Sequence, residues 1–151
     1  MRETEMDEIE DHGPDPDEIA RASADAMWVG DKASAGLGMR LLDVGPGYAT
    51  MAMTITEAMT NGHGQAHGGF IFLLADSAFA FACNSRGEKS VAQNCQITFL
   101  KSGRLGDQLV ATAHEVYQEG RSGIYDINVS AGDETIAEFR GHSRTIGGRW
   151  V

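Results

Sequence analysis

The segment from Gly68 to Asn84 constrains the fold most, because it is apolar on almost every side. It reads GGFIFLLADSAFAFACN, which is longer than an ordinary strand and rich in alanine and leucine. A helix without a polar face must be buried. The sequence therefore predicts a central helix enclosed by the other elements of the chain.

Strand patterns flank this helix on both sides in the sequence. A turn at Gly45-Pro46-Gly47 predicts a hairpin before the helix, and further glycine-containing breaks separate strands after it. The six predicted strands are 37–44, 48–56, 90–100, 108–118, 123–131 and 135–146. Two strands, one buried helix and four antiparallel strands indicate an α+β fold, in which the sheet is expected to curl around the helix.

A second helix is predicted ahead of the first strand. Asp15 or Asp17 can cap it, Pro16 suits its first turn, and the glycines from Gly36 onwards would end it. Its apolar face is expected to consist of Ile19, Ala22, Ala26, Met27 and Val29.

The charge of the chain is concentrated in its N-terminal part. The net charge is −10, and residues 1–20 contain nine acidic side chains and only one basic one. Residues 1–14 are therefore expected to be an acidic, mobile tail, followed by a single domain over 15–151. The nearly neutral body offers no basic surface, so a nucleic-acid partner is not expected.

The remaining composition indicates a cytoplasmic protein that has no membrane partner. No apolar run reaches the roughly 18 residues of a transmembrane helix. The first residues lack the basic and then apolar pattern of a secretory signal. Cys83 and Cys95 show no metal-ligand spacing and are expected to be reduced thiols.

Asp76 is the residue most in need of a functional explanation. It lies in the middle of the apolar helix, in the sequence LLADSAFAF, where a lone carboxylate costs several kcal/mol to bury. A purely structural carboxylate, held by a backbone group or an arginine, is the alternative. A desolvated carboxylate in a pocket suits nucleophilic or general-base chemistry, and we favour that interpretation.

The start of the same helix predicts a site for a ligand oxygen. Gly68 and Gly69 have no side chains, and a helix start presents unpaired amides and the positive end of the dipole. Such a start can polarise a carbonyl or bind an anion. A tight loop that merely needs glycine is the simpler alternative.

A polar loop precedes the glycines and contains Asn61, His63, Gln65 and His67. The two histidines are four residues apart, but they flank a glycine in a loop and lack a third metal ligand, so no metal is expected. We expect His67 to shape the loop or contact the reacting group. Asn61 can position a water or a carbonyl oxygen, although Asn61-Gly62 is also an ordinary turn.

Helix geometry suggests that the site is shared between two chains. Gly68 and Asp76 are eight residues apart, which is about 12 Å along a helix and roughly 80° around it. Reacting atoms must approach to about 3–3.5 Å. A symmetric dimer, with Gly68 of one chain facing Asp76 of the other, would satisfy this requirement.

Residues 61–87, NGHGQAHGGFIFLLADSAFAFACNSRG, strongly resemble the phenylacetic-acid-degradation (PaaI) type of hotdog thioesterase. The motif is Asn-Gly-His, then His-Gly-Gly, then a helix with Ala-Asp. The resemblance extends through the strand at 91–100, through 120–126 and through 139–141. The acidic tail is the main departure from the family pattern.

The resemblance implies a curved antiparallel sheet wrapped around one long helix, in dimers that form homotetramers. It implies hydrolysis of aryl-acyl-CoA, such as phenylacetyl-CoA and its hydroxylated forms, with no cofactor apart from the CoA of the substrate. In this interpretation Asp76 is base or nucleophile, the Gly68 amide polarises the carbonyl, and Asn61 and His67 support the reacting group. Further substrate contacts are expected from Gly69, Lys101, Arg104 and Arg121.

The sequence is also compatible with other functions. A hotdog dehydratase or hydratase would pair His67 with Asp76 to move a proton beside the thioester carbonyl. A non-catalytic acyl-CoA sensor would be expected to have an attached DNA-binding segment, and an acidic tail cannot supply one. A purely structural oligomer would leave Asp76 unexplained.

Overall fold

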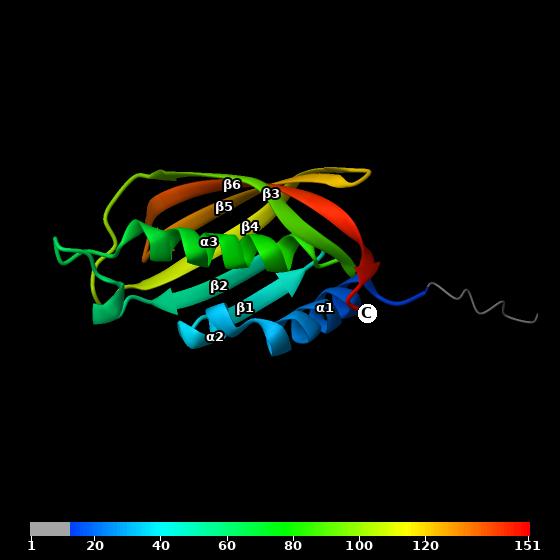
Figure 1. The fold of residues 1–151 in the computed structure, drawn as a ribbon, viewed down its shortest axis with the longest axis horizontal. Coiled ribbons are helices and arrows are strands. Elements are labelled where there is room, and N and C mark those ends of the chain that lie inside the picture. Colours follow the sequence, from blue (N-terminus) through cyan, green and yellow to red (C-terminus); the bar gives the residue numbers. More distant parts are fainter. Residues whose placement is uncertain (1–12) are drawn as a thin grey trace, which may run out of the picture.

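The computed structural model describes residues 13–151, so all but the last two residues of the predicted acidic tail lie outside the described part (Figure 1). In chain order its elements are α1 (Pro16–Gly30), α2 (Lys32–Gly36), β1 (Arg40–Gly45), β2 (Tyr48–Thr54), the 3-10 turn η1 (Glu57–Met59), α3 (Gly68–Cys83), β3 (Glu88–Phe99), β4 (Gln108–Glu119), β5 (Ser122–Ala131) and β6 (Glu134–Arg149).

The six strands form one antiparallel sheet in the order β1-β2-β4-β5-β6-β3. The sheet curves around α3, while α1 and α2 lie beside the β1 and β2 end (Figure 1). The predicted α+β class and the central helix are therefore confirmed. Strand β3 is an edge strand that follows α3 directly in the chain but pairs with β6, the last strand.

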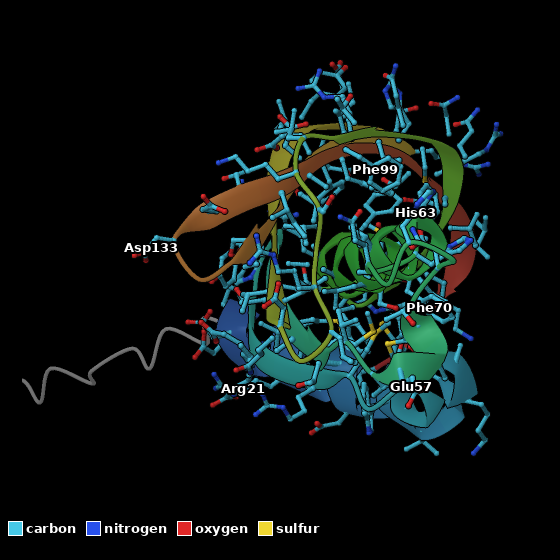
Figure 2. All side chains as sticks on the ribbon, turned by 90° about the vertical axis from the view of Figure 1, so that its left-hand side faces the viewer. Arg21, Glu57, His63, Phe70, Phe99 and Asp133 are labelled. Atoms are coloured by element: carbon cyan, nitrogen blue, oxygen red, sulfur yellow. The ribbon has the colours of Figure 1, made fainter. Side chains whose placement is uncertain are left out.

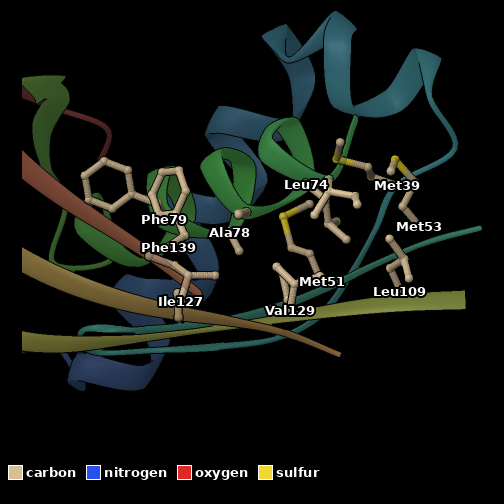
Figure 3. Close-up of a cluster of buried hydrophobic side chains, with 14 of the residues drawn as sticks. Met39, Met51, Met53, Leu74, Ala78, Phe79, Leu109, Ile127, Val129 and Phe139 are labelled. Carbon is tan, nitrogen blue, oxygen red and sulfur yellow. The ribbon is translucent and has the colours of Figure 1, made fainter. Parts of the chain in front are cut away.

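The hydrophobic core lies between α3 and the concave face of the sheet. Leu74, Ala78 and Phe79 of the helix meet Met51 of β2 and Val129 of β5 (Figure 3). Along β5 the burial alternates with period two, so that every second side chain faces α3. The apolar surface removed from water along this interface is the main force that holds the helix in the sheet.

The helix α3 is less enclosed in the single chain than its sequence predicts. A strip with the spacing i, i+4 and i+7 stays half-buried, consisting of Asp76, Ala80 and Cys83. This strip is left uncovered because the sheet has six strands, and its last strand, β3, ends the wrap around the helix. The prediction of burial on every side is therefore wrong for one chain taken alone.

The N-terminal helix also differs from its prediction. Asp15 is the cap and Pro16 the first residue, as expected, but the helix breaks at Asp31 into α1 and α2. Ala22 is exposed and Val29 is 77% exposed, so the predicted face is wrong at these two positions. Ile19, Ala26 and Met27 are half-buried, as the prediction requires. The buried residues are Ala20, Ser23 and Ala24, because packing against β1, and not hydropathy alone, decides which side faces inward.

Among residues 13–151, no helix has both the length and the apolar character needed to cross a bilayer.

Candidate functional site

Asp76 lies on the half-buried strip of α3, the side of the helix that the sheet leaves uncovered. Burial raises the pKa of its carboxyl above the ordinary value, and the negative charge of Asp31 raises that pKa further. No hydrogen bond to its side chain is found within the described residues. A carboxylate with a raised pKa is a better proton acceptor than an ordinary one, which suits general-base chemistry.

The first turn of α3 leaves one backbone amide without a partner. The Nδ1 atom of His67 accepts a hydrogen bond from the Gly69 amide at 2.9 Å, and the His67 carbonyl accepts one from the Phe70 amide at 3.0 Å. The amide of Gly68 makes no hydrogen bond within residues 13–151. His67 thus caps the helix, and the Gly68 amide is the donor that a ligand oxygen could use.

The aromatic ring of Phe99, at the end of β3, lies against Gly68. A Cβ atom at position 68 would come within 3.0 Å of Phe99 Cζ and 3.3 Å of Cε1. A side chain here would press on the Phe99 ring, so glycine suits this position for space and not for an unusual backbone angle. Viewed along α3 from its N-terminal end, Phe99, His63 and Phe70 lie around the start of the helix (Figure 2).

Asn61 organises the loop before α3. Its Oδ1 atom accepts hydrogen bonds from the amides of His63 at 2.9 Å and Gln65 at 3.2 Å, and its own amide donates to the Gln65 carbonyl. This is the arrangement of an asparagine that holds a tight turn. In the single chain the side-chain oxygen of Asn61 thus serves the loop.

Lys101 and Arg104 line a surface cavity of about 630 Å³, to which Gln65 of this loop also contributes. Gln65 and Ser102 lie in the same wall, joined by a hydrogen bond of 3.0 Å between the serine hydroxyl and Gln65 Oε1. The ammonium of Lys101 is 3.1 Å from Glu134, whereas Arg104 forms no ion pair within the described residues. The loop before α3 is joined to the segment that forms this wall, because the Ala66 amide donates a hydrogen bond to the Gly103 carbonyl at 2.9 Å.

Arg121 lies elsewhere in the single chain. It belongs to the turn between β4 and β5, whereas Lys101 and Arg104 line a cavity with Gly132, in the turn between β5 and β6. These two turns are at opposite ends of β5, whose ten residues span roughly 30 Å. One chain therefore does not bring Arg121 together with the other two cations.

The fold brings two residues to this region that were not predicted from the sequence. Phe99 is one, since no sequence pattern links it to Gly68, 31 positions earlier. Ser77 is another, and it could have been found, because a serine beside Asp76 in an otherwise apolar helix is itself a polar residue in need of a partner.

The arrangement defines the class of protein. One helix lies inside a curved antiparallel sheet, carries a carboxylate with a raised pKa, and starts at an amide that has no partner in the described part of the chain. This is the hotdog architecture, with the two groups that acyl-transfer chemistry requires, a proton acceptor and an amide donor.

The comparisons with known proteins identify the family. A model of the Thioesterase superfamily matches residues 63–138. The acyl-coenzyme A thioesterase PaaI of Escherichia coli K12 is 46% identical over 127 residues, which cover 83% of this chain and 91% of that protein. The chain belongs to the Thioesterase superfamily, and within it to the PaaI-type proteins.

Solved structures agree with this assignment. The structure of the E. coli PaaI protein, from the phenylacetic acid degradation operon, has a TM-score of 0.88 at 43% identity and covers 89% of this chain and 99% of its own. A Streptococcus mutans protein bound to acetyl CoA has a TM-score of 0.71 at 26% identity, covering 74% of this chain and 90% of its own. The predicted hotdog fold is thus confirmed.

Proposed function

We propose that this protein is an acyl-CoA thioesterase that hydrolyses aryl-acyl-CoA, such as phenylacetyl-CoA or its hydroxylated forms. One molecule of water and the thioester give the free acid and the CoA thiol. The observation that carries the proposal is the pairing, on one helix, of a Gly68 amide that has no partner among the described residues with a carboxylate of raised pKa at Asp76. The E. coli relative is named as an acyl-coenzyme A thioesterase, which supports the same reaction.

In this mechanism the Gly68 amide donates to the thioester carbonyl oxygen and stabilises the negative charge that develops on it. Asp76 either takes a proton from water that attacks the carbonyl carbon or attacks that carbon itself. His67 holds the Gly69 amide and so orients the turn that presents Gly68. The thiolate of CoA leaves as the carbonyl re-forms, and it takes up a proton. If Asp76 is the nucleophile, the resulting acyl–aspartate anhydride is then hydrolysed by water, which releases the free acid and restores the carboxylate.

The CoA part of the substrate is assigned to the cavity lined by Lys101 and Arg104, since its phosphates need local cations in a chain of net negative charge. Arg104 is the stronger candidate of the two, because Lys101 is already paired with Glu134. The relative solved with acetyl CoA supports a CoA ligand. Gly69 is a weaker candidate for a substrate contact, because its amide is held by His67.

We further propose a homodimer that shares its two active sites and that assembles into a homotetramer. Asp76 and Gly68 are separated by about 12 Å along their own helix, so one chain cannot bring both to a single carbonyl. The half-buried strip of α3 lies beside β3, a 12-residue edge strand with exposed Val91 and Phe99. An unpaired edge of this length and an adjacent half-buried strip favour pairing with a second copy.

Nothing in the geometry favours the dehydratase alternative. In that chemistry a histidine would move a proton beside the thioester carbonyl, yet Nδ1 of His67 is engaged as the cap of α3. The two free cysteines agree with a reducing compartment, and we propose a cytoplasmic location.

A thiol-release assay over a panel of acyl-CoAs tests the activity. We expect aryl-acetyl-CoA to be hydrolysed faster than acetyl-CoA or long-chain acyl-CoA. Asp76→Asn should lose most of the activity and still bind CoA. Full activity in Asp76→Ala would refute the role of this carboxylate.

Mixed dimers test the shared site. A dimer of one Gly68→Val chain and one Asp76→Asn chain contains one intact site if the sites are shared, so about half of the wild-type activity should return. If each site lies within one chain, the same mixed dimer has none. Absence of activity in confirmed mixed dimers would therefore contradict the proposal.

A further inference from the structure

A hydrogen-bonded chain of three side chains connects the N-terminal helices to the residue next to Asp76. The Oδ2 atom of Asp31 is 2.7 Å from the hydroxyl of Ser34, and that hydroxyl is 2.8 Å from the hydroxyl of Ser77. Ser77 follows Asp76 directly on α3. These hydrogen bonds link Ser34 and Ser77, which are 43 positions apart in the sequence. They join two elements that no strand pairing connects.

The direction of each hydrogen bond follows from the chemistry of the groups. A carboxylate only accepts, so the single hydroxyl proton of Ser34 is donated to Asp31. The Ser34 oxygen must then accept from Ser77, which donates its own proton. The other oxygen of Asp31 accepts from the Ser34 amide at 3.0 Å, so both carboxylate oxygens are engaged by one residue.

The three hydrogen-bonded side chains are well shielded from water. Ser34 is 1% exposed and Ser77 is 8% exposed, while Asp31 is half-buried. Hydrogen bonds in such surroundings are stronger than exposed ones, and leaving one group unpaired is costly. Ser77 is therefore held in one orientation, and the turn of α3 that carries Asp76 is fixed in its rotation about the helix axis.

We infer that Asp31 is a positioning residue for the Asp76 carboxylate, acting through Ser34 and Ser77 to hold the turn of α3 that aims that carboxylate. The inference rests on the proposed function, because it assigns a second role within the same site. Asp31 does not touch the reacting atoms.

The charges around Asp76 single out Asp31. Among residues 13–151, three titratable groups interact with Asp76: Asp31 between α1 and α2, Cys83 on α3, and Cys95 on β3. Burial raises the pKa of Cys83 to about 12 and also raises the pKa of Cys95, and the charge of Asp76 adds to both shifts. Both thiols are therefore neutral near pH 7, which leaves Asp31 as the charged neighbour among the described residues.

The positioning by hydrogen bonds and the effect of the charge can be separated by mutation. Asp31→Asn removes the charge but keeps an acceptor for the cap of α2, whereas Ser77→Ala keeps the charge and breaks the connection to α3. We expect the acid limb of the kcat/KM profile to move to lower pH in Asp31→Asn, with little loss of thermal stability. In Ser77→Ala the limb should stay in place while kcat falls about three- to thirtyfold at unchanged KM.

Asp25→Asn is the matched control, since it removes an exposed carboxylate of α1 whose side chain forms no hydrogen bond or ion pair with the rest of the described chain. It should leave the profile where it is. If Asp31→Asn does not fold, Asp31→Ser supplies an alternative cap without charge. An unchanged kcat in Ser77→Ala, or an acid limb that is identical in wild type and in a folded, uncharged position-31 variant, would overturn the inference.

The carboxyl group of Asp76 can also be followed by ¹³C NMR during a pH titration, which requires no substrate. Its midpoint should be lower in Asp31→Asn than in wild type. If the acyl-CoA panel shows no hydrolysis, the proposed function fails, and the NMR titration still decides whether Asp31 controls Asp76. An unmoved midpoint would exclude that control.

Discussion

The ring of Phe99 lies so close to Gly68 that a Cβ atom at position 68 would be 3.0 Å from Phe99 Cζ. This contact ties the last residue of β3 to the first residue of α3. It places an aromatic surface next to the amide that is proposed to bind the thioester carbonyl, and it explains why a glycine stands at the start of the helix.

Gly68→Ala tests that relationship directly. The added methyl group must displace the Phe99 ring or shift the amide, so we expect kcat/KM to fall by about 10- to 100-fold. Gly62→Ala is the matched control, since no atom lies within 4 Å of its Cβ position, and it should keep its activity. The double variant Gly68→Ala/Phe99→Ala should regain part of the loss; no recovery would mean that the contact is not the cause.

His67 should matter for stability as well as for the site. Removing the cap in His67→Ala leaves the Gly69 amide unpaired and is expected to cost about 1 kcal/mol of the free energy of unfolding. His67→Asn retains a side-chain acceptor at the cap and should be close to wild type. Thermal unfolding followed by circular dichroism compares the two, and equal melting temperatures would contradict the assigned role.

Asp76→Asn should stabilise the protein at neutral pH while it abolishes activity. The folded-state pKa lies above the ordinary value of 3.8, so the folded protein holds this proton more tightly than the unfolded chain does. The stability of the wild type therefore falls as the pH rises from about 3.8 through the folded-state pKa.

The asparagine variant escapes this loss, and its Tm at pH 7 should be higher by on the order of 2–4 °C. The advantage should shrink as the pH is lowered towards the ordinary carboxyl pKa. A variant that is less stable than wild type at pH 7 would argue that the Asp76 carboxylate has a structural partner.

Arg104→Ala should weaken CoA recognition without affecting the chemical step. Loss of a charged hydrogen bond to a phosphate is expected to raise KM about tenfold with kcat unchanged. Arg21→Ala removes an exposed cation on α1 and serves as the control. Arg121→Ala gives a further comparison: an equal rise in KM would mean that the partner subunit brings the far turn to the same CoA.

Much of the fold could be read from local patterns. The apolar run of α3 and the turn at Gly45-Pro46-Gly47 predicted their elements within a few residues, because side-chain periodicity and backbone preference act over neighbouring positions. The placement of Asp76 and Gly68 on one helix was equally visible, since eight residues of helix fix their separation.

The sequence was a poorer guide to which side of the N-terminal helix is buried and to which cations lie together. Val29 was assigned to a buried face and is 77% exposed, because the side of a helix that packs depends on the element it meets. Arg121 was grouped with Arg104, but the strand register places them at opposite ends of β5.

The sequence by itself determined that a carboxylate would stand inside an apolar helix and that glycines would open that helix. Both are properties of consecutive residues, and hydrophobic patterning carries them without knowledge of the rest. Only the tertiary structure decided that Phe99 covers Gly68 and that Asp31 reaches Ser77 through Ser34. Such contacts join residues far apart in the chain. They are set by sheet register and helix packing, and no local sequence pattern encodes either of these.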